Sequence, residues 1–478
     1  MSGIIFVSAF LDLGEDRSKD KSVEICFQHF YALAQTGIPI HLFLSPCYKE
    51  LYESLQMENV VVEYINLSDL DTYREIQDLN PRLPTNRTAH HDTRPFLTLM
   101  NAKVELVHRV AEARQQAATH YAWIDFSIFH VFKRPKEAGE FLQMLSNTRL
   151  RSEIIFPGCW WHPGTNGDSL FHQVNWRFCG GFFVGSVDHI AELNKLYRDY
   201  FRSIVDKSGL TWEVNMWAHF ENRYGWSPKW FKGDHNDSII RVPADYIPVV
   251  ASLTTIPSRR SDCILAISSL IAQVDHIYLS VCKKYERFQE PWETPEVFES
   301  EPYASKLTIV YSDDYGPATK YIGAVDKIPA NTWVFICDDD QIYHPNLILR
   351  MKYSLQSYSV LQNHCEQIKK KTSGGLVHGY VGLFMSSNMM RGLKGFDLPQ
   401  PARFVDDQWA SIYCFKHGIP IVGSTIEEYR EIFEVLQGWH ERIGVDSVAS
   451  LNNRAEMVRA IAEFFSVRFL EGGGVQAV

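Results

Sequence analysis

The sequence lacks the features that mark several large classes of protein. No apolar run reaches the length of about 18 residues that a membrane-spanning helix needs. Basic residues are outnumbered, with 47 Lys and Arg against 57 Asp and Glu, so the formal net charge is −10. That balance argues against a nucleic-acid partner, which is bound through a basic patch, and against docking on anionic lipid. Low-complexity blocks are absent too, which indicates a globular chain.

The sequence also lacks the short motifs of several enzyme classes. It contains no GxSxG elbow, no Walker loop and no GxGxxG after a predicted strand, so hydrolase, NTPase and dehydrogenase functions find no support. No HExxH or i, i+4 pair of histidines predicts a metal site. The nine cysteines are scattered without a CxxC, and their odd number indicates reduced thiols and a cytoplasmic protein. The N-terminus lacks a basic stretch and predicts a β-strand, not a signal peptide.

What the sequence does contain suits two globular domains. Its 478 residues are too many for one ordinary domain and fit two of about 200 to 250 residues each. Hydrophobic residues make up 45% and aromatic residues 13%, including 12 Trp. So many aromatic rings fit a protein that stacks them on sugars or bases, but a large core consumes them as well.

The first half alternates strands and helices, which is the pattern of a mostly parallel sheet with helices on both faces. We expect strands at Ile4–Phe10, Ile40–Leu44, Val60–Ile65 and Tyr121–Asp125, and helices at Ser22–Gln35 and Pro95–Gln116. The second half restarts the pattern. There we expect strands at Val249–Thr255, His276–Val281, Leu307–Tyr311 and Thr332–Cys337, and helices at Ser261–Gln273 and Ala318–Lys327.

The fold class predicted from this order is α/β, with two tandem Rossmann-like domains. Gly, Asp, Asn and Pro cluster between Gly233 and Pro248, so we place the domains at 1–240 and 241–425. A helical extension is expected at 426–478, with helices at Ile426–Leu436 and Arg454–Phe469 and a disordered end from Gly472. The halves share an architecture without a residue-level repeat.

Three consecutive aspartates follow a strongly predicted strand of the second half. The run Trp333–Cys337 is wholly apolar, as expected for a central strand buried on both faces. Asp338, Asp339 and Asp340 then fall at the carboxyl end of the sheet, where open α/β folds bind ligands. Crowded carboxylates need a cation to neutralise them. Asp338 and Asp340 can face one way and share Mn²⁺ or Mg²⁺, whose remaining positions suit a diphosphate.

Two other interpretations of the triplet were weighed. An acidic turn can cap the helix expected near Pro345, although one Asp would serve for that. A phosphatase with an aspartyl-phosphate intermediate needs Thr or Val two places after its second carboxylate, and Tyr343 and His344 follow here instead. We therefore prefer a metal site, in which the metal stabilises the charge on a departing nucleoside diphosphate.

Residues near the triplet complete a predicted site for a nucleotide sugar. Lys320 ends a turn that leads into a helix and is offered to a phosphate, together with backbone N–H groups at the helix start. Thr254, Thr255 and Arg259 follow the first strand of this half, where a base and ribose would lie.

A second acidic pair, Asp406 and Asp407, precedes Trp409. The hydroxyl of a sugar acceptor is a poor nucleophile, so a transferase that inverts configuration needs a carboxylate base beside it. Either aspartate is a candidate for that base, and a plain helix N-cap is the alternative. The stretch Gly379–Gly382 either passes close to the acceptor or forms a turn.

These motifs together resemble a nucleotide-sugar glycosyltransferase of the GT-A fold with a DDD motif, over roughly Val249–Val422. The matching segments are Gly316–Lys320, the triplet with Tyr343 and Pro345, and Asp406–Trp409. The resemblance implies that the triplet carries Mn²⁺ and the nucleotide diphosphate, with Asp338 and Asp340 as ligands. It also implies that Asp407 is the base.

The first half offers a weaker version of the same constellation. Asp125 is a single carboxylate after a strand, which is more often a cap or turn residue. Phe10, Asp12 and Arg17 follow the first strand, where a nucleotide would lie. Lys103, on the long helix, can meet a phosphate.

A late, aromatic-rich helix of this half carries Glu213, which we compare with Asp407. The first half resembles the bacterial HtrL/YibB-like family of predicted glycosyltransferases, within about Ile4–Trp230. The matching segments are Val7–Asp12, Asn101–Lys103, Trp123–Phe126 and Glu213 with its aromatic neighbours. The resemblance implies that Asp125 is the metal-side carboxylate and that Glu213 is a base candidate.

The sequence thus predicts a cytoplasmic, bifunctional glycosyltransferase of polysaccharide biosynthesis with two GT-A-like domains. Each domain would transfer a sugar from a nucleoside-diphosphate donor to a hydroxyl of a growing glycan, with Mn²⁺ or Mg²⁺ at least in the second. The alternatives are an inactive, carbohydrate-binding first domain, and a nucleotide-sugar hydrolase. No nucleic acid and no membrane span is expected.

Overall fold

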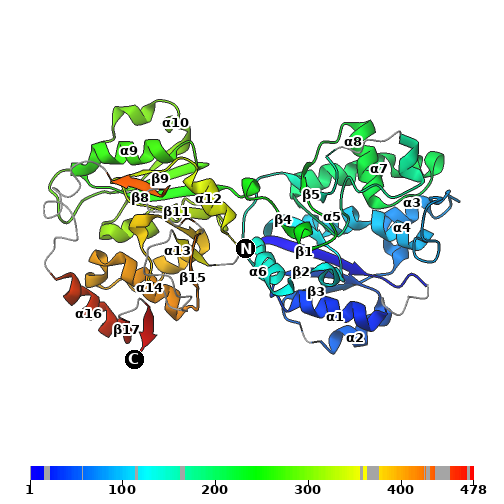
Figure 1. The fold of residues 1–478 in the computed structure, drawn as a ribbon, viewed down its shortest axis with the longest axis horizontal. Helices are drawn as coiled ribbons and strands as arrows, with labels where there is room; N and C mark the ends of the chain where they lie inside the picture. The colour runs from blue at the N-terminus through cyan, green and yellow to red at the C-terminus, as the bar shows by residue number, and fades with distance from the viewer. Residues whose placement is uncertain are drawn as a thin grey trace. The chain divides into compact units, whose positions relative to one another are not determined.

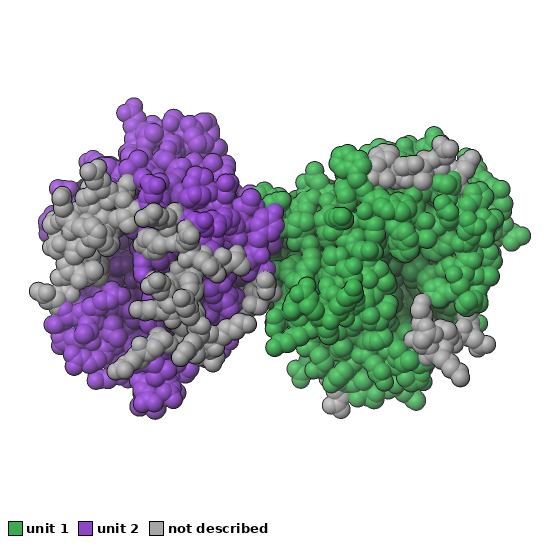
Figure 2. All heavy atoms as spheres, viewed as in Figure 1, with its two compact units in different colours: residues 1–246 green, residues 247–478 purple. Residues whose placement is uncertain are grey.

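The computed structural model describes residues 2–14, 22–55, 57–113, 117–161, 167–355, 359–362, 376–424, 426, 431–435, 453–470 and 474–478. They form two compact units, Met1–Tyr246 and Ile247–Val478 (Figure 2). The division falls within the stretch of Gly, Asp, Asn and Pro between Gly233 and Pro248. Each unit is an α/β fold with helices flanking one large sheet (Figure 1), as the fold-class prediction has it.

The sheet of the first unit has seven strands in the order β3-β2-β1-β4-β6-β5-β7. The strands are β1 (Ser2–Phe10), β2 (Ile40–Leu44), β3 (Val60–Tyr64), β4 (Ala118–Ile124), β5 (Ile154–Gly158), β6 (Phe182–Ser186) and β7 (Lys229–Lys232). Neighbouring strands are parallel, except that β6 is antiparallel to both β4 and β5.

The helices of the first unit are α1 (Val23–Ala34), α2 (Lys49–Glu53), α3 (Asp71–Ile76), α4 (Arg94–Asn101), α5 (Lys103–Ala113), α6 (Pro135–Ser146), α7 (Val187–Ser208) and α8 (Glu213–Tyr224). The helix expected at 95–116 is two helices instead. Its break lies at Ala102, whose N–H bonds to the carbonyls of both Thr98 and Leu99 in a tightened final turn.

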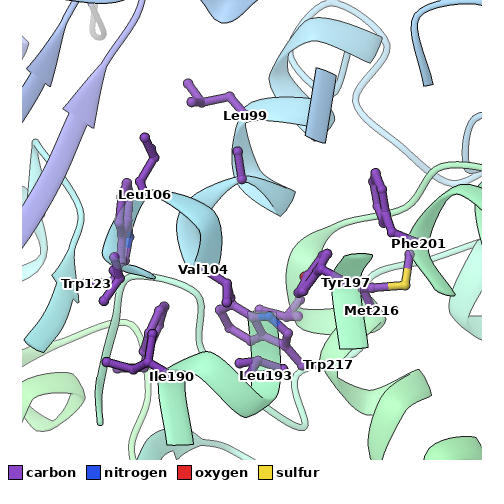
Figure 3. Close-up of a cluster of buried hydrophobic side chains, with 14 of the residues drawn as sticks. Leu99, Val104, Leu106, Trp123, Ile190, Leu193, Tyr197, Phe201, Met216 and Trp217 are labelled. Carbon is purple, nitrogen blue, oxygen red and sulfur yellow. The ribbon is translucent and has the colours of Figure 1, made fainter. Parts of the chain in front are cut away.

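A large apolar cluster on one face of this sheet fixes α5, α7 and α8 (Figure 3). Trp123 of β4, Tyr197 of α7 and Trp217 of α8 are among its buried members. Val104, the second residue of α5, and Val214, the second residue of α8, also belong to it. The cluster therefore sets the positions of the first turns of α5 and α8 relative to the end of β4.

The second unit repeats the sheet of the first, strand for strand. Its seven strands have the order β10-β9-β8-β11-β14-β13-β15. They are β8 (Val249–Thr254), β9 (His276–Cys282), β10 (Leu307–Ser312), β11 (Trp333–Ile336), β13 (Val360–Gln362), β14 (Leu383–Ser386) and β15 (Ile421–Gly423). Here β14 is antiparallel to β11 and β13, as β6 is to β4 and β5.

Several helices of the second unit have counterparts in the first. The helices of the second unit are α9 (Arg260–Leu270), α10 (Tyr303–Lys306), α11 (Thr319–Ile322), α12 (Leu347–Tyr353), α13 (Ser387–Lys394), α14 (Asp406–Lys416) and α16 (Arg454–Phe465). In each unit a helix follows the antiparallel strand directly, α7 after β6 and α13 after β14, and the next helix is α8 or α14. The two halves thus share one topology.

Two predicted helices of the second half differ from the structure. The helix expected at 318–327 ends at Ile322, and the next residue, Gly323, packs so closely on Ser280 that a Cβ would lie 2.7 Å from its Oγ. The helix expected at 426–436 lies partly outside the described residues, and near its end the chain forms β16 (Phe433–Val435), which pairs with β12 (Gln341–Tyr343). Ile432 and Phe433 are buried there, so tertiary packing overrides helix propensity.

The end of the chain is ordered where a disordered tail was expected. The helix expected to reach Phe469 stops at Phe465, since Ser466 takes a left-handed conformation with φ 53°. Strand β17 (Val467–Phe469) follows and pairs with β18 (Val475–Ala477). Burial of Val475 against the core of the second unit holds this strand in place.

Candidate functional site

In the second unit, acidic residues meet at the carboxyl edge of the sheet. Asp338 follows β11, and Asp406 and Asp407 open helix α14. Lys320 lies in the first turn of α11, and Ser252 of β8 donates a hydrogen bond from its Oγ to the Lys320 carbonyl over 2.8 Å. The central strands and these two helix starts therefore bring together residues that are up to 87 positions apart in the sequence.

The Lys320 ammonium group joins the two acidic segments. Its Nζ lies 2.8 Å from Asp338 Oδ1 and 3.1 Å from Asp406 Oδ2. Burial lowers the pKa of Lys320, but the two carboxylates outweigh burial and hold that pKa well above the ordinary value for lysine. Lys320, predicted to meet a phosphate, is thus a buried, charged link that holds Asp338 against Asp406.

Asp407 occupies a different environment from Asp406. Its Oδ1 accepts hydrogen bonds from the Tyr321 hydroxyl at 3.2 Å and from the Gly379 N–H at 3.0 Å. Burial raises the pKa of Asp407 to about 7, with the neighbouring Asp406 as the next cause. Asp407 therefore exchanges a proton near neutral pH, which is the property required of a general base.

The remaining two aspartates of the triplet pair with an arginine. Arg259 Nη1 lies 3.1 Å from Asp339 Oδ1 and 3.0 Å from Asp340 Oδ2. Burial raises the pKa of Asp339, against the effect of Arg259. Thr255 is buried and hydrogen-bonded to Asp339. Thr254 lies further off, with its hydroxyl donated to the Ser280 carbonyl over 2.8 Å.

The side chains of Asp338 and Asp340 were expected to point in the same direction. In the structure they contact different basic residues. Asp339 and Asp340 share the guanidinium group of Arg259, while Asp338 turns to Lys320. The reason is that the strand ends at Ile336 and the chain bends at 339 and 340, so the alternation of an extended strand no longer holds.

The charges of this centre leave room for a cation. Five carboxylates contact or neighbour two basic side chains, so three negative charges are in excess when every group is ionised. Within the described ranges, no group of three or more His, Cys, Asp or Glu side chains is gathered to hold a metal ion. Mg²⁺, however, is usually held by one or two carboxylates together with substrate phosphates. Asp338 and Asp340 are carboxylates of the kind that such a metal needs, and each is paired here with a basic side chain, Lys320 or Arg259.

The first unit carries a matching centre around Lys103. Its Nζ lies 3.0 Å from Asp125 Oδ1, after β4, and 2.8 Å from Glu213 Oε1, at the start of α8. The same Nζ donates to the Gly180 carbonyl over 2.9 Å. Burial lowers the pKa of Lys103, but Asp125 and Glu213 outweigh it, so the pKa is raised and the lysine stays charged.

Two further contacts fix the acids of this centre. The Trp123 indole donates from Nε1 to Asp125 Oδ1 over 2.6 Å, because residues i and i+2 lie on one side of the strand end. Gly180 leaves room for Glu213, since a Cβ at that position would lie 2.1 Å from Oε1. Gly180 thus serves close packing of the backbone against Glu213, whereas Gly181 packs on Ile239 and Ile128.

Some predicted residues of the first unit lie apart from this centre. Phe10 is buried in an aromatic cluster, stacked on Phe126 with ring centroids 4.4 Å apart. Asp12 is exposed, and its Oδ1 accepts from the Gly14 N–H in a local turn. Arg17 lies outside the described residues. Of the predicted residues that the structure describes in this unit, Lys103, Asp125 and Glu213 are the ones brought together.

The two centres correspond residue by residue at three positions. In each, a buried lysine of the helix before the central strand pairs with the acid that follows this strand and with the first residue of a late helix. Glu213 therefore corresponds to Asp406, whereas the sequence suggested Asp407. One further pair differs: the residues after Lys320 and Asp406 are Tyr321 and Asp407, and those after Lys103 and Glu213 are Val104 and Val214.

This difference changes the chemistry of the first unit. Tyr321 and Asp407 form a hydrogen-bonded polar pair, whereas Val104 and Val214 are buried members of the apolar core. The first unit consequently has no carboxylate at the position that corresponds to Asp407, whose pKa is about 7. Sequence reasoning missed Tyr321 because its contact with Asp407 spans 86 residues.

None of the described helices combines the length and the apolar character that a membrane-spanning segment needs.

Neither a protein-family profile nor a curated protein matches the sequence of the chain. Among solved structures, it is similar to 4-diphosphocytidyl-2C-methyl-D-erythritol synthase from Anaerococcus prevotii, with 12% identity and a TM-score of 0.26, over 40% of this chain and 93% of that one. It is also similar to residues 1–349 of S. aureus TarS, with 12% identity and a TM-score of 0.30, over 46% of this chain and 71% of that one. TM-scores this low carry no argument about function, which must be argued from the site.

Proposed function

We propose that the second unit is a glycosyltransferase that moves a sugar from a nucleoside-diphosphate donor to a hydroxyl of a glycan. The observation that carries the proposal is the buried acidic centre at the carboxyl edge of its sheet. There, five aspartates outnumber two basic residues, and one of them, Asp407, has a pKa of about 7. A centre with excess negative charge and a base suits a metal-bound donor and a hydroxyl acceptor.

Each residue has a distinct part in this proposal. Asp338 and Asp340 would hold Mn²⁺ or Mg²⁺, which when bound supplies stabilisation of the charge on the departing diphosphate. Lys320 holds Asp338 against Asp406, and Arg259 fixes Asp339 and Asp340. Thr254, the last residue of β8, and Thr255, which follows it, are assigned to the nucleotide.

Asp407 would accept the proton of the acceptor hydroxyl. With a pKa of about 7 it is partly ionised at neutral pH, so it can take up a proton and release it again. The hydrogen bonds from Tyr321 and Gly379 keep one carboxylate oxygen fixed. The second oxygen is then the one offered to the acceptor.

The test is the release of nucleoside diphosphate from UDP-, GDP- and dTDP-sugars in the presence of Mn²⁺, with and without oligosaccharide acceptors. A transferase releases the nucleotide faster when an acceptor is present and forms a longer glycan. Equal release without acceptor would make the unit a nucleotide-sugar hydrolase. No release with any donor, from protein that is folded, would contradict both.

For the first unit, two functions are supported by different observations. Its Lys103, Asp125 and Glu213 repeat the lysine-linked acids of the second unit, which supports a second transferase site and a bifunctional enzyme. Val104 and Val214, in place of Tyr321 and Asp407, support a glycan-binding domain without a base. A single metal-side acid, Asp125, also weakens the case for a metal there.

Asp125→Ala and Asp338→Asn distinguish these two functions. If the chain is bifunctional, each variant stops the addition of a different sugar, and mass spectrometry of the products shows two different truncated glycans. If the first unit only binds glycan, Asp125→Ala leaves every addition intact, while Asp338→Asn stops the transfer. The tethering of two sites on one chain raises the effective concentration of the shared glycan in either case.

A further inference from the structure

Three exposed tryptophans lie on neighbouring loops of the first unit. The exposed fractions of Trp160, Trp161 and Trp176 are 47%, 80% and 42%. The other tryptophans in the described part of the chain are buried or half-buried. An exposed indole leaves a large apolar area in contact with water. Three exposed indoles on neighbouring loops therefore indicate a ligand-binding surface.

The backbones of these loops are tied together. The Cys159 N–H donates to the Trp176 carbonyl over 3.0 Å, and Arg177 Nη1 donates to the Trp160 carbonyl over 2.9 Å. Arg177 is itself buried and bonded through two nitrogens to Glu221, at 2.9 and 2.8 Å. The tryptophans are thus presented by a braced backbone, which lowers the entropy lost when a ligand binds.

The tryptophan loops lead directly into the Lys103 centre. Only three residues of chain lie between Trp176 and Gly180, whose carbonyl accepts the Lys103 ammonium hydrogen bond. At about 3.3 to 3.6 Å per residue, their Cα atoms lie at most about 14 Å apart. A short oligosaccharide spans a separation of that size.

The groups around the indoles favour a sugar over a lipid surface. The exposed neighbours His172, Gln173, Asp234 and His235 are polar, and Asp234 Oδ1 lies 3.5 Å from the Cys159 Sγ beside the tryptophans. The one arginine in these loops, Arg177, is buried. Anionic membranes need exposed basic residues, whereas a sugar ring needs an aromatic face beside hydrogen-bonding groups.

We propose that Trp160, Trp161 and Trp176 form a binding surface for a glycan, on which sugar rings stack as the chain extends toward the Lys103 centre. The identity of this glycan as the acceptor of the transfer rests on the proposed function. Binding itself does not, because it requires only the indoles. The surface serves a second transferase site and a glycan-binding domain equally.

The test uses the full chain with cellohexaose, maltohexaose and chitohexaose as probes. Saturation-transfer NMR and isothermal titration measure binding to the wild type, to Trp160→Ala, Trp161→Ala and Trp176→Ala, and to Tyr353→Ala. Tyr353 is an aromatic residue of the second unit with an exposed fraction of 63%, so it is the matched control. Asp338→Asn is included because it disables the proposed transfer and leaves the indoles in place.

At least one probe should bind, and each indole removed should weaken binding about tenfold, with an unchanged melting temperature. Tyr353→Ala and Asp338→Asn should bind as the wild type does. A protein without transferase activity that still binds through the tryptophans would refute the proposed function alone. Binding that ignores all three tryptophan variants would overturn the inference, as would failure of every probe to bind. Tryptophan-dependent binding to phosphatidylcholine vesicles in place of the oligosaccharides would also overturn it.

Discussion

Replacing Lys103 by Met should destabilise the first unit selectively. The substitution keeps the length of the side chain and removes the charge that faces Asp125 and Glu213. Asp125 is 37% exposed and can be solvated by water, but the Glu213 side chain is 7% exposed and would be left as an unpaired buried charge. Breaking a buried pair from one side costs about 3 to 5 kcal/mol. That is a large part of the roughly 5 to 15 kcal/mol of a typical domain.

The assay is urea unfolding followed by pulsed hydrogen exchange and mass spectrometry, which reports peptides of each unit separately. Peptides from α5 and α8 should lose protection at lower urea, while those of the second unit stay unchanged. Lys103→Met combined with Glu213→Gln should recover much of the loss, because the unpaired charge is gone. A cost below about 1 kcal/mol, or the same cost in the Glu213→Gln background, would refute an electrostatic link through Lys103.

Other substitutions test the remaining contacts. Asp407→Asn should lower kcat by about 10² to 10⁴ and remove the rise of activity with pH around 7; an unchanged pH–rate profile would exclude Asp407 as the base. The pKa of Asp407 is raised in the folded state, so the wild type should lose stability as pH climbs from the unfolded pKa toward about 7. The free energy of unfolding in urea should therefore differ less between pH 5 and pH 8 in Asp407→Asn than in the wild type. Gly180→Ala should cost about 1 to 3 kcal/mol, since its Cβ would lie 2.1 Å from Glu213 Oε1. Gly395→Ala, whose nearest contact would be 3.6 Å, is the control, and equal costs would argue against the close packing.

Much of the fold could be read from the sequence because its signals are local. Strand β2 runs Ile40–Leu44 as predicted, and α1 begins where the Ser22 hydroxyl accepts the Ile25 N–H. Apolar runs and caps of this kind need no knowledge of distant residues. The prediction failed at Phe433–Val435, where pairing with β12, about 90 residues earlier, decides the structure.

The site was predictable in its location and not in its connections. An acid that follows a parallel strand lies at the carboxyl edge of its sheet. This rule placed Asp125 in the first unit and Asp338 in the second from the sequence alone. The partners of Lys103 and Lys320 could not be read in the same way, because each joins segments far apart in the chain. A phosphate-binding lysine and a lysine that links two acids look alike in a sequence.

The correspondence of the two halves lay beyond sequence reasoning for a related reason. The register between Glu213 and Asp406 depends on where α8 and α14 begin, and helix ends are poorly fixed by local patterns. Once both helix starts are known, Val214 is the second residue of α8 and Asp407 the second residue of α14, so these two positions correspond. That one-residue shift decides whether the residue of the first unit that corresponds to Asp407 is Glu213 or Val214.

The most direct measurement is a thermal-shift screen of the intact chain against UDP-, GDP-, dTDP- and CMP-sugars, with and without Mn²⁺, in the wild type and in Asp338→Asn. A donor at 100 times its dissociation constant adds about 2.7 kcal/mol to the stability of the unit that binds it. We expect one nucleotide class to stabilise the wild type only with Mn²⁺ and to leave Asp338→Asn unaffected. Folded wild-type protein that no donor stabilises, or a donor effect that persists in Asp338→Asn, would contradict a metal-dependent nucleotide-sugar site at the aspartate triplet.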